Sequence, residues 1–253
     1  MKMETITSTT NPTAKRLKSL NDSKGRRTEN AFLVEGEVMI REALSCGLIP
    51  LEALSEKDIP LLSELNGARL CTRSVLESVC DTKTPQGICA SFRLPDETAI
   101  SKDAKRIIAL DGVQDPGNVG TILRTADAAG FEGVLLDTRC PDIFSPKVQR
   151  ASMGSLFRMP CIKGEMQQML ENYQAQGYKT VVAALDGLEL YTNVPGFLSD
   201  RLILVIGNEA KGVSAQVQNS ADIKLKIPMR GKAESLNAAV AAGIMMYELT
   251  RDC

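Results

Sequence analysis

Histidine is absent from this chain of 253 residues. It is the side chain that most often acts as a general base near neutral pH, and it completes the Ser-His-Asp triad and many metal sites. Its absence excludes imidazole catalysis and histidine-ligated metals, and with them many hydrolases. Any chemistry in this protein must therefore use other side chains.

Paired cysteines and long apolar runs are also missing. The seven cysteines are odd in number and form no CxxC pair, which fits neither a disulfide framework nor a zinc site. No run of about 18 apolar residues could span a bilayer, and residues 1–20 lack the apolar segment of a secretory signal. We therefore expect a cytoplasmic protein with no membrane partner. We expect reduced, mostly buried thiols at Cys46, Cys71, Cys80, Cys89, Cys140, Cys161 and Cys253.

The formal net charge of only −1 argues against bulk attraction to nucleic acid, but the charge is unevenly distributed. Basic residues gather between residues 15 and 27. A local cluster of this kind suits the phosphate backbone of a nucleic acid, because binding releases counterions. A solvated helix face would give the same pattern, and the residues alone leave both interpretations open. The cluster, interrupted only by Asp22, consists of Lys15, Arg16, Lys18, Lys24, Arg26 and Arg27.

Hydrophobic residues make up 43% of the chain, enough for the core of one large or two modest domains. Residues 1–94 alternate short apolar strands with helical patterns, which predicts a small α/β domain. The polar segment 95–105 predicts a linker. Residues 106–253 contain short apolar runs separated by helical segments, which predicts a mostly parallel sheet covered on both faces.

Ligands of such sheets bind beyond the carboxyl ends of the strands, which points to the loops after Leu110, Ile206 and Ile227. The first loop, "DGVQDPGNVGTILRTADAAGF", opens a helix whose apolar face begins at Val119 and leaves Arg124 off that face. An exposed arginine is the ordinary interpretation of that position. The turn does not match GxGxxG, so a Rossmann dinucleotide site is poorly supported.

The second loop lies in "VIGNEAKGVS" and has the glycine spacing of a phosphate-binding loop at Gly207 and Gly212. Val213 and Ser214 stand where that loop needs a lysine followed by serine or threonine. The carboxylate of Glu209 would repel a phosphate, whereas it could accept hydrogen bonds or balance a cation. An exposed turn glutamate is the alternative. We therefore do not expect this loop to hold a triphosphate.

The third loop, "IPMRGKAESLNAAVAAGIMMYELT", leads into an alanine-rich helix. Ser235 and Asn237 at its start are typical of helix beginnings, so taken alone they indicate no more than an N-cap. Small residues in the helix would let other backbones approach closely, which predicts a packing element. Its large apolar residues form one stripe, made of Leu236, Val240, Ile244 and Tyr247.

Together and in this order, "NVGTILRTADAAGF", "IGNEAKGVS" and "IPMRGKAESLNAAVAAGIMMYEL" resemble the three signature motifs of the SpoU (TrmH) RNA 2′-O-methyltransferases. The likeness covers roughly residues 105–250, and "ITSTTNPTAKRLKSL" with "FLVEGEVMIREAL" resembles the N-terminal substrate-binding domain of many rRNA-modifying members. The resemblance implies a catalytic set of Asn118, Arg124, Glu209, Ser235 and Asn237. It implies cofactor contacts at Gly207, Ile227 and Leu236.

The resemblance also implies S-adenosylmethionine as the methyl donor, a C-terminal domain with a deep trefoil knot, and a homodimer. No metal is expected. The N-terminal segment favours rRNA over tRNA as the substrate, with methylation of the same kind on tRNA as the alternative. The residues then expected to bind RNA are Lys15, Arg16, Lys18, Arg26 and Arg27.

The role of Arg124 is left open by the residues. Candidates for removing the proton of the ribose 2′-hydroxyl are Arg124, Glu209 and the phosphate of the substrate. The family's proposals favour the arginine as base, yet a guanidinium also suits a phosphate clamp or the stabilisation of a developing alkoxide. Two other functions are alternatives: a catalytically silent RNA-binding protein of this fold, and a nucleotide-hydrolysing enzyme, which the missing P-loop lysine disfavours.

Overall fold

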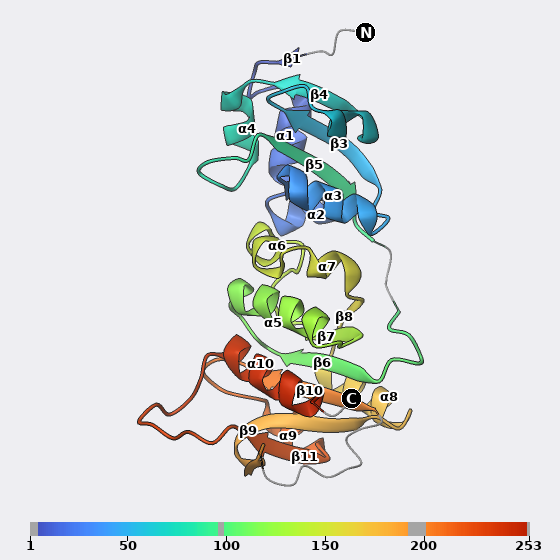
Figure 1. The fold of residues 1–253 in the computed structure, drawn as a ribbon. Helices are drawn as coiled ribbons and strands as arrows, with labels where there is room; N and C mark the ends of the chain where they lie inside the picture. Colours follow the sequence, from blue (N-terminus) through green and yellow to red (C-terminus); the bar gives the residue numbers. More distant parts are fainter. Residues whose placement is uncertain (1–4, 96–98, 192–200, 252–253) are drawn as a thin grey trace. The chain divides into compact units, whose positions relative to one another are not determined.

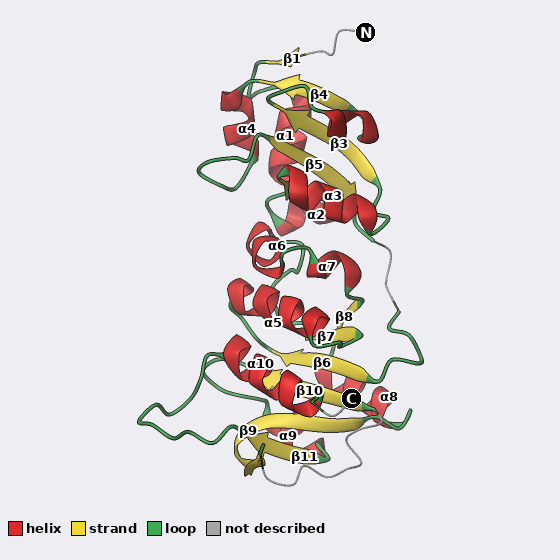
Figure 2. Cartoon of the chain, viewed as in Figure 1, coloured by secondary structure: helices red, strands yellow, loops and turns green. Residues whose placement is uncertain are grey.

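The computed structural model describes residues 5–95, 99–191 and 201–251, which form two compact units (Figure 1). The first unit comprises Met1–Asp96 with Phe144–Phe157, and the second comprises Glu97–Ile143 with Arg158–Cys253. Each combines helices with strands, as predicted (Figure 2). The domain limits 1–94, 95–105 and 106–253 stay a prediction.

The first unit is built on a five-stranded mixed sheet with the order β1-β4-β3-β5-β2. Strands β1, β4 and β3 pair in parallel, whereas β5 is antiparallel to both β3 and β2. The strands are β1 (Thr5–Ile6), β2 (Ala31–Glu35), β3 (Pro50–Ser55), β4 (Ala68–Cys71) and β5 (Ile88–Arg93). The helices are α1 (Pro12–Ser19), α2 (Ser23–Glu29), α3 (Glu37–Ser45), α4 (Arg73–Val79), α6 (Pro146–Ser152) and α7 (Ser155–Arg158).

The basic segment of the first unit is helical. Helix α1 begins with Pro12 in its first turn, and the side chain of Asn11 caps it by accepting from the Thr13 backbone N–H at 2.9 Å. Residues 58–67, "DIPLLSELNG", have a helical pattern in the sequence, but the structure forms only a short 3₁₀ helix there, η1 (Pro60–Glu64). A short helix with a proline at its start therefore replaces the expected longer one.

The second unit contains a six-stranded sheet with the order β11-β9-β10-β6-β7-β8, in which every neighbouring pair is parallel. This confirms the predicted parallel sheet, although the short edge strands β8 and β11 were not predicted. The strands are β6 (Arg106–Asp111), β7 (Gly133–Asp137), β8 (Cys161–Gly164), β9 (Lys179–Glu189), β10 (Leu202–Gly207) and β11 (Ile223–Lys226). The helices are α5 (Pro116–Ala128), α8 (Met166–Gln174), α9 (Ala215–Ser220) and α10 (Ala238–Leu249).

The two central strands of this sheet, β6 and β10, are in a register that places Gly207 opposite Asp111. Both strands are almost wholly buried, with fully buried side chains such as Ile107, Ala109 and Val205 in the core. Parallel strands end at the same edge of a sheet. The loops that follow β6 and β10 therefore leave the sheet side by side.

Helix α10 is a packing element, as predicted, but it does not pack through the stripe of large residues read from the sequence. It lies against α5, where a Cβ added at Gly243 would be 3.4 Å from Cγ2 of Thr125. In contrast, Val240 and Tyr247 are 51% and 56% exposed. The helix is apolar on nearly every side, so periodicity alone could not show which face is buried. The residues buried on α10 are Ala239, Ala242, Met245 and Met246.

The thiols agree with the expectation from sequence. None of the six cysteines in the described part of the chain forms a disulfide, and four of them are buried, namely Cys71, Cys80, Cys89 and Cys140, while Cys253 lies outside the described residues. Burial raises the pKa of the Cys140 thiol to about 11, which keeps it protonated and unreactive at neutral pH. Among the described helices, none combines the length and the apolar character needed to cross a bilayer.

Candidate active site

The loop after β10 is closed on itself by two backbone hydrogen bonds between Asn208 and Gly212, at 3.0 and 2.9 Å. The close turn depends on glycine at both ends. Gly212 has φ +68°, and a Cβ at Gly207 would lie only 2.1 Å from the carbonyl carbon of Gly212. The glycine spacing noted in the sequence therefore serves to fold this loop tightly.

Glu209, at the tip of this loop, is bound to the neighbouring loop after β6. Its carboxylate accepts hydrogen bonds from the backbone N–H groups of Gln114 and Asp115 at 3.2 and 3.1 Å, and from Nδ2 of Asn118 at 2.9 Å. Burial of the carboxyl would raise its pKa, but these hydrogen bonds outweigh burial and lower the pKa below its ordinary value of 4.5. Glu209 is therefore an ionised acceptor at neutral pH, and it is more than an exposed turn residue.

Asn118 and Asn237 extend this network to the third motif. Nδ2 of Asn237 donates to Oδ1 of Asn118 at 2.9 Å, while Oδ1 of Asn237 caps helix α10 by accepting from the backbone of Ala239 and Val240. The N-cap interpretation of this position was thus correct but incomplete. A chain of hydrogen bonds runs from Asn237 through Asn118 to Glu209, and it joins one residue from each of the three motifs.

A cavity of about 820 Å³ lies beside this network in the second unit. All three predicted cofactor positions, Gly207, Ile227 and Leu236, line it, together with Glu209 and Asn237. Further apolar side chains come from the end of β10, from β9 and from α10. A volume of this size, with mostly apolar walls and a few polar groups, is typical of sites for small molecules. The additional apolar wall residues include Leu185, Ile206, Met229 and Met245.

The side chains of the other two predicted catalytic residues, Ser235 and Arg124, have no hydrogen bond in the described part of the chain. Ser235 lines the cavity and is exposed. Arg124 is exposed on α5, as expected from its position off the apolar face, but it is not part of the cavity wall. The structure of one chain therefore brings together Asn118, Glu209 and Asn237, places Ser235 at the cavity, and leaves Arg124 apart.

The basic residues predicted to bind RNA divide into two groups. Lys15, Lys18 and Arg27 are exposed on α1 and α2. The guanidinium of Arg16 is paired with Glu52. Arg26 is only 3% exposed, and its Nη1 donates to the carbonyl oxygens of Leu20 and Asn21 at 2.7 and 2.9 Å. Including Arg26 in an exposed cluster was therefore wrong, because its charged group is used to hold the turn between α1 and α2.

Sequence reasoning missed several polar residues at the same edge of the sheet. Asp111 and Asp137 end the strands β6 and β7 and are almost fully buried, and Arg139 pairs with both. Asn208 holds its loop to the strand end by donating from Nδ2 to the carbonyl of Gly112 at 2.9 Å. The signal was present, since both strands are apolar runs that end in an aspartate, but no motif marks these residues.

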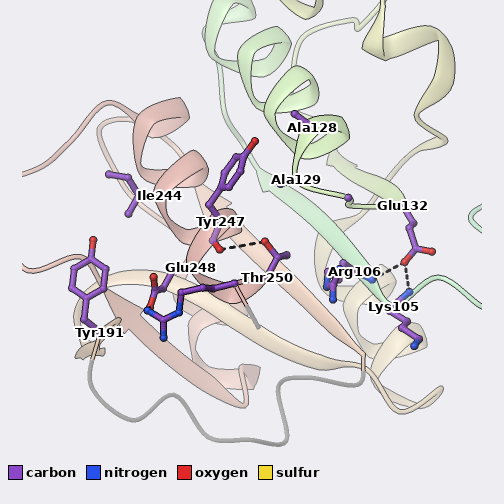
Figure 3. A pocket seen from close by; sticks show the side chains of 12 residues that line it. Lys105, Arg106, Ala128, Ala129, Glu132, Tyr191, Ile244, Tyr247, Glu248 and Thr250 are labelled. Atoms are coloured by element: carbon purple, nitrogen blue, oxygen red, sulfur yellow. Dashed lines mark hydrogen bonds and ion pairs between the residues drawn. The ribbon is translucent and has the colours of Figure 1, made fainter. Parts of the chain in front are cut away.

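A second hollow, of about 950 Å³, opens near the end of α10 (Figure 3). Ile244, Tyr247 and Glu248 line it, facing Lys105 and Glu132. None of the predicted catalytic or cofactor residues belongs to it. The chemistry predicted from the three motifs is therefore associated with the smaller cavity.

The motifs that meet at this cavity define an RNA methylase. The profile of the SpoU rRNA methylase family matches residues 105–247, and that of the MRM3-like substrate-binding domain matches residues 11–90. The chain belongs to the SpoU rRNA methylase family, which confirms the resemblance read from its sequence.

Individual relatives cover almost the whole chain. The Bacillus subtilis 23S rRNA (guanosine(2553)-2′-O)-methyltransferase RlmP is 36% identical over 98% of this chain and 99% of its own length. The AdoMet-bound rRNA methyltransferase from Sinorhizobium meliloti is 30% identical, with a TM-score of 0.88 over 98% of this chain and 97% of that one. The SpoU methyltransferase AviRb from Streptomyces viridochromogenes, in complex with the cofactor AdoMet, is 26% identical, with a TM-score of 0.82 over 95% and 97% of the two chains.

Proposed function

We propose that this protein binds S-adenosylmethionine in the cavity of the second unit and transfers its methyl group to a ribose 2′-hydroxyl in rRNA. The enzyme class and the cofactor predicted from the motifs are confirmed by the family and by the relatives. The observation that carries the proposal is the hydrogen-bonded chain of Glu209, Asn118 and Asn237 beside this cavity. It offers fixed polar groups next to a space of the right size.

The residues of the cavity fit the cofactor. S-adenosylmethionine, when bound, supplies a methyl group activated on a sulfonium. Gly207, Ile227 and Leu236 would hold it through backbone groups and apolar contact. The wall carries the carboxylates Asp186, Glu209 and Glu234 against the ammonium groups Lys211 and Lys226, a balance that suits a cation better than a triphosphate. Isothermal titration with S-adenosylmethionine and with ATP tests this, and tighter binding of ATP would contradict it.

The network positions the polar groups around the target ribose. Because Glu209 is an ionised acceptor, it fixes the amide of Asn118, and Asn118 in turn fixes Asn237. Rigid polar groups lower the entropy lost when the hydroxyl is brought in line with the methyl group. The hydroxyl of Ser235 at the cavity wall is available to contact the substrate. We propose that Arg124 is essential for methyl transfer. We do not assign the removal of the proton to it, because its exposed guanidinium fits a phosphate clamp and a base equally.

We further propose that the active form is a homodimer in which Arg124 of one subunit completes the cavity of the other. Arg124 lies off the wall of the cavity in its own chain. Helix α5, which carries it, packs against α10, whose exposed Val240 and Tyr247 offer an apolar surface for a two-fold contact. A two-fold contact would bring two copies of α5 toward two cavities.

Mixed dimers test this arrangement. We expect subunits carrying Arg124→Ala and subunits carrying Leu236→Arg to be inactive alone and to regain partial activity when mixed, because one of the two composite sites is then intact. Val240→Glu combined with Tyr247→Glu should give a monomer without activity. A fully active monomer, shown by light scattering at the assay concentration, would contradict the dimer.

The knot is also a proposal, and it is supported by membership of the family. Pulling the ends of the chain apart with optical tweezers tests it. An unknotted chain extends by about 3.6 Å per residue, whereas a tightened knot shortens that length measurably. A full extension would contradict the knot. We also propose a cytoplasmic location, where unmodified rRNA is accessible.

The substrate is proposed to be rRNA of the large ribosomal subunit, on the basis of the relative from Bacillus subtilis and the match to a substrate-binding domain. Ribose methylations should be mapped in rRNA and tRNA from cells with and without the gene. We expect one rRNA position to lose its methyl group, and the guanosine corresponding to that of the relative is the first to examine. Loss confined to tRNA would favour the alternative substrate.

A further inference from the structure

Two buried aspartates share one arginine at the carboxyl edge of the parallel sheet. The side chains of Asp111 and Asp137 are only 1% and 2% exposed, whereas that of Arg139 is 55% exposed. Nη2 of Arg139 donates to Oδ1 of Asp111 at 2.6 Å, and its Nε donates to Oδ1 of Asp137 at 2.5 Å. Within residues 5–95, 99–191 and 201–251, Arg139 is the only cation paired with either carboxyl group.

The guanidinium of Arg139 is held in place by the backbone around it. The backbone N–H of Arg139 donates to Oδ1 of Asp137 at 3.0 Å, so the residue and its partner form a local turn. Gly112 has φ +71°, and a Cβ there would lie 3.2 Å from Cζ of Arg139. The absence of a side chain at Gly112 thus leaves room for the guanidinium against the main chain.

The end of β6 also holds both ends of the loop that closes the cavity. Oδ2 of Asp111, the oxygen not used by Arg139, accepts from the backbone N–H of Ser214 at 2.7 Å. The carbonyl of Gly112 accepts from Nδ2 of Asn208 at 2.9 Å. Asn208 begins the loop and Ser214 follows it. The contacts of Asp111 and Gly112 therefore hold both ends of the loop that carries Glu209.

We propose that Arg139 is a positioning residue for methyl transfer: by supplying the counter-charge to Asp111, it keeps the loop 208–214 in the shape that binds S-adenosylmethionine. This inference rests on the proposed function of the cavity. A buried carboxylate without a counter-charge is strongly disfavoured and moves toward water. Without Arg139, Asp111 leaves Ser214, and one end of the loop is released.

Two separate binding measurements test the inference. For Arg139→Ala, we expect the Kd for S-adenosylmethionine, measured by isothermal titration, to rise about tenfold, the size of effect expected when a loop loses one hydrogen bond to a charged acceptor. The Kd for an unmethylated 23S rRNA transcript should stay unchanged. The turnover number at saturating S-adenosylmethionine should be largely retained. Hydrogen exchange of the peptide containing Ser214 should become faster in the unliganded protein.

A second variant separates the effect of the lost charge from the effect of lost packing. In Arg139→Ala combined with Asp111→Asn and Asp137→Asn, neither buried side chain needs a counter-charge, and the amide oxygen at position 111 can still accept from Ser214, so cofactor binding should recover most of its loss. Arg158→Ala is the matched control, because it removes an arginine of similar exposure, 40%, that pairs with Asp127 away from the loop. We expect this control to bind S-adenosylmethionine as the unmodified protein does.

Four results would overturn the inference: unchanged cofactor affinity in Arg139→Ala, an equal loss of RNA affinity, an equal loss in the Arg158→Ala control, or a triple variant no better than the single one. If Arg139→Ala does not fold, the triple variant still decides, because the inference requires it to fold and to bind the cofactor. The proposed function fails separately, namely if the unmodified protein does not bind S-adenosylmethionine at all.

Discussion

The two units present their polar side chains in different places, the second at one edge of its sheet and the first on its helices. In the second unit all six strands are parallel, so the loops after β6 and β10 emerge together and their side chains converge. In the first unit β1, β2, β3 and β4 run the same way, and only β5 runs antiparallel to its neighbours β3 and β2. Its basic residues are instead displayed on the helices α1 and α2. The second unit therefore gathers its polar groups at the carboxyl edge of a parallel sheet, whereas the exposed charges of the first unit lie on helix surfaces.

The largest effect is expected from a substitution that disrupts the site of the second unit and leaves the first unit intact. We expect Arg124→Ala to fold normally and to lower the turnover number by about 10²–10³, the usual loss for one transition-state contact. The Kd for rRNA should change little if the first unit provides most of the RNA affinity. The control is Arg41→Ala, which removes an exposed arginine of the first unit. Near-normal turnover of the purified Arg124→Ala variant would contradict the assignment.

The next effect concerns the close turn after β10. Gly207→Ala forces a Cβ into the backbone of Gly212 and should lower the free energy of unfolding by about 1–3 kcal/mol, the range for overpacking. Chemical denaturation and titration with S-adenosylmethionine measure the two consequences. Gly231→Ala is the control for stability, because nothing lies within 4 Å of a Cβ there. Equal stability of both variants would show that the turn tolerates a side chain.

A smaller effect is expected in the first unit. Replacing Lys15, Lys18 and Arg27 by glutamine should weaken rRNA binding and flatten its log–log salt dependence by about 2, at ~0.7 for each lost contact with single-stranded RNA. Affinity for S-adenosylmethionine should not change. The same three charges removed at Lys57, Arg41 and Arg73 provide the control. An unaltered slope of the salt dependence in the first variant would show that these basic residues form a solvated helix face and do not contact RNA.

The smallest expected effect concerns pH, because the contribution of Glu209 to stability should not change near neutral pH. Folding lowers the pKa of Glu209 below 4.5, so its contact contributes fully above that pH and is lost only as the pH falls below it. The difference in melting temperature between the protein and Glu209→Gln should therefore be constant from about pH 6 to 9 and shrink below 4.5. A change in that difference between pH 6 and 9 would show that Glu209 titrates there.

What the sequence could predict was local or carried by a motif. The apolar runs of β6, β7 and β10 and the order of the three motifs were sufficient for the parallel sheet and the family. The burial of Arg26 could not be predicted, because a basic residue in a basic run is normally exposed, and only the folded turn supplies its two carbonyl partners. The stripe that contains Val240 and Tyr247 was visible in the sequence, but its exposure could not be predicted, since a helix that is apolar on nearly every side does not show which face is buried.

The pairing of Arg139 with Asp111 was also beyond the sequence. The two residues lie on different strand ends and come together only through the parallel register of β6 and β7. Non-local contacts of this kind depend on strand order, which no local pattern encodes. The network of Asn118, Glu209 and Asn237 was accessible only because the family motifs pointed to its members, and their hydrogen bonds to one another were not predicted.

The register that sets Gly207 opposite Asp111 limits how the length of the chain can vary. Side chains alternate between the faces of a strand, so one residue inserted within β6 or β10 would turn the residues beyond it to the opposite face. Two inserted residues would restore the face but move the strand end by about 6.6 Å, away from Ser214 and the cavity. Natural variants of this protein that keep their activity are therefore expected to gain or lose residues outside these two strands, for instance at the exposed end of α8, where no predicted site residue lies.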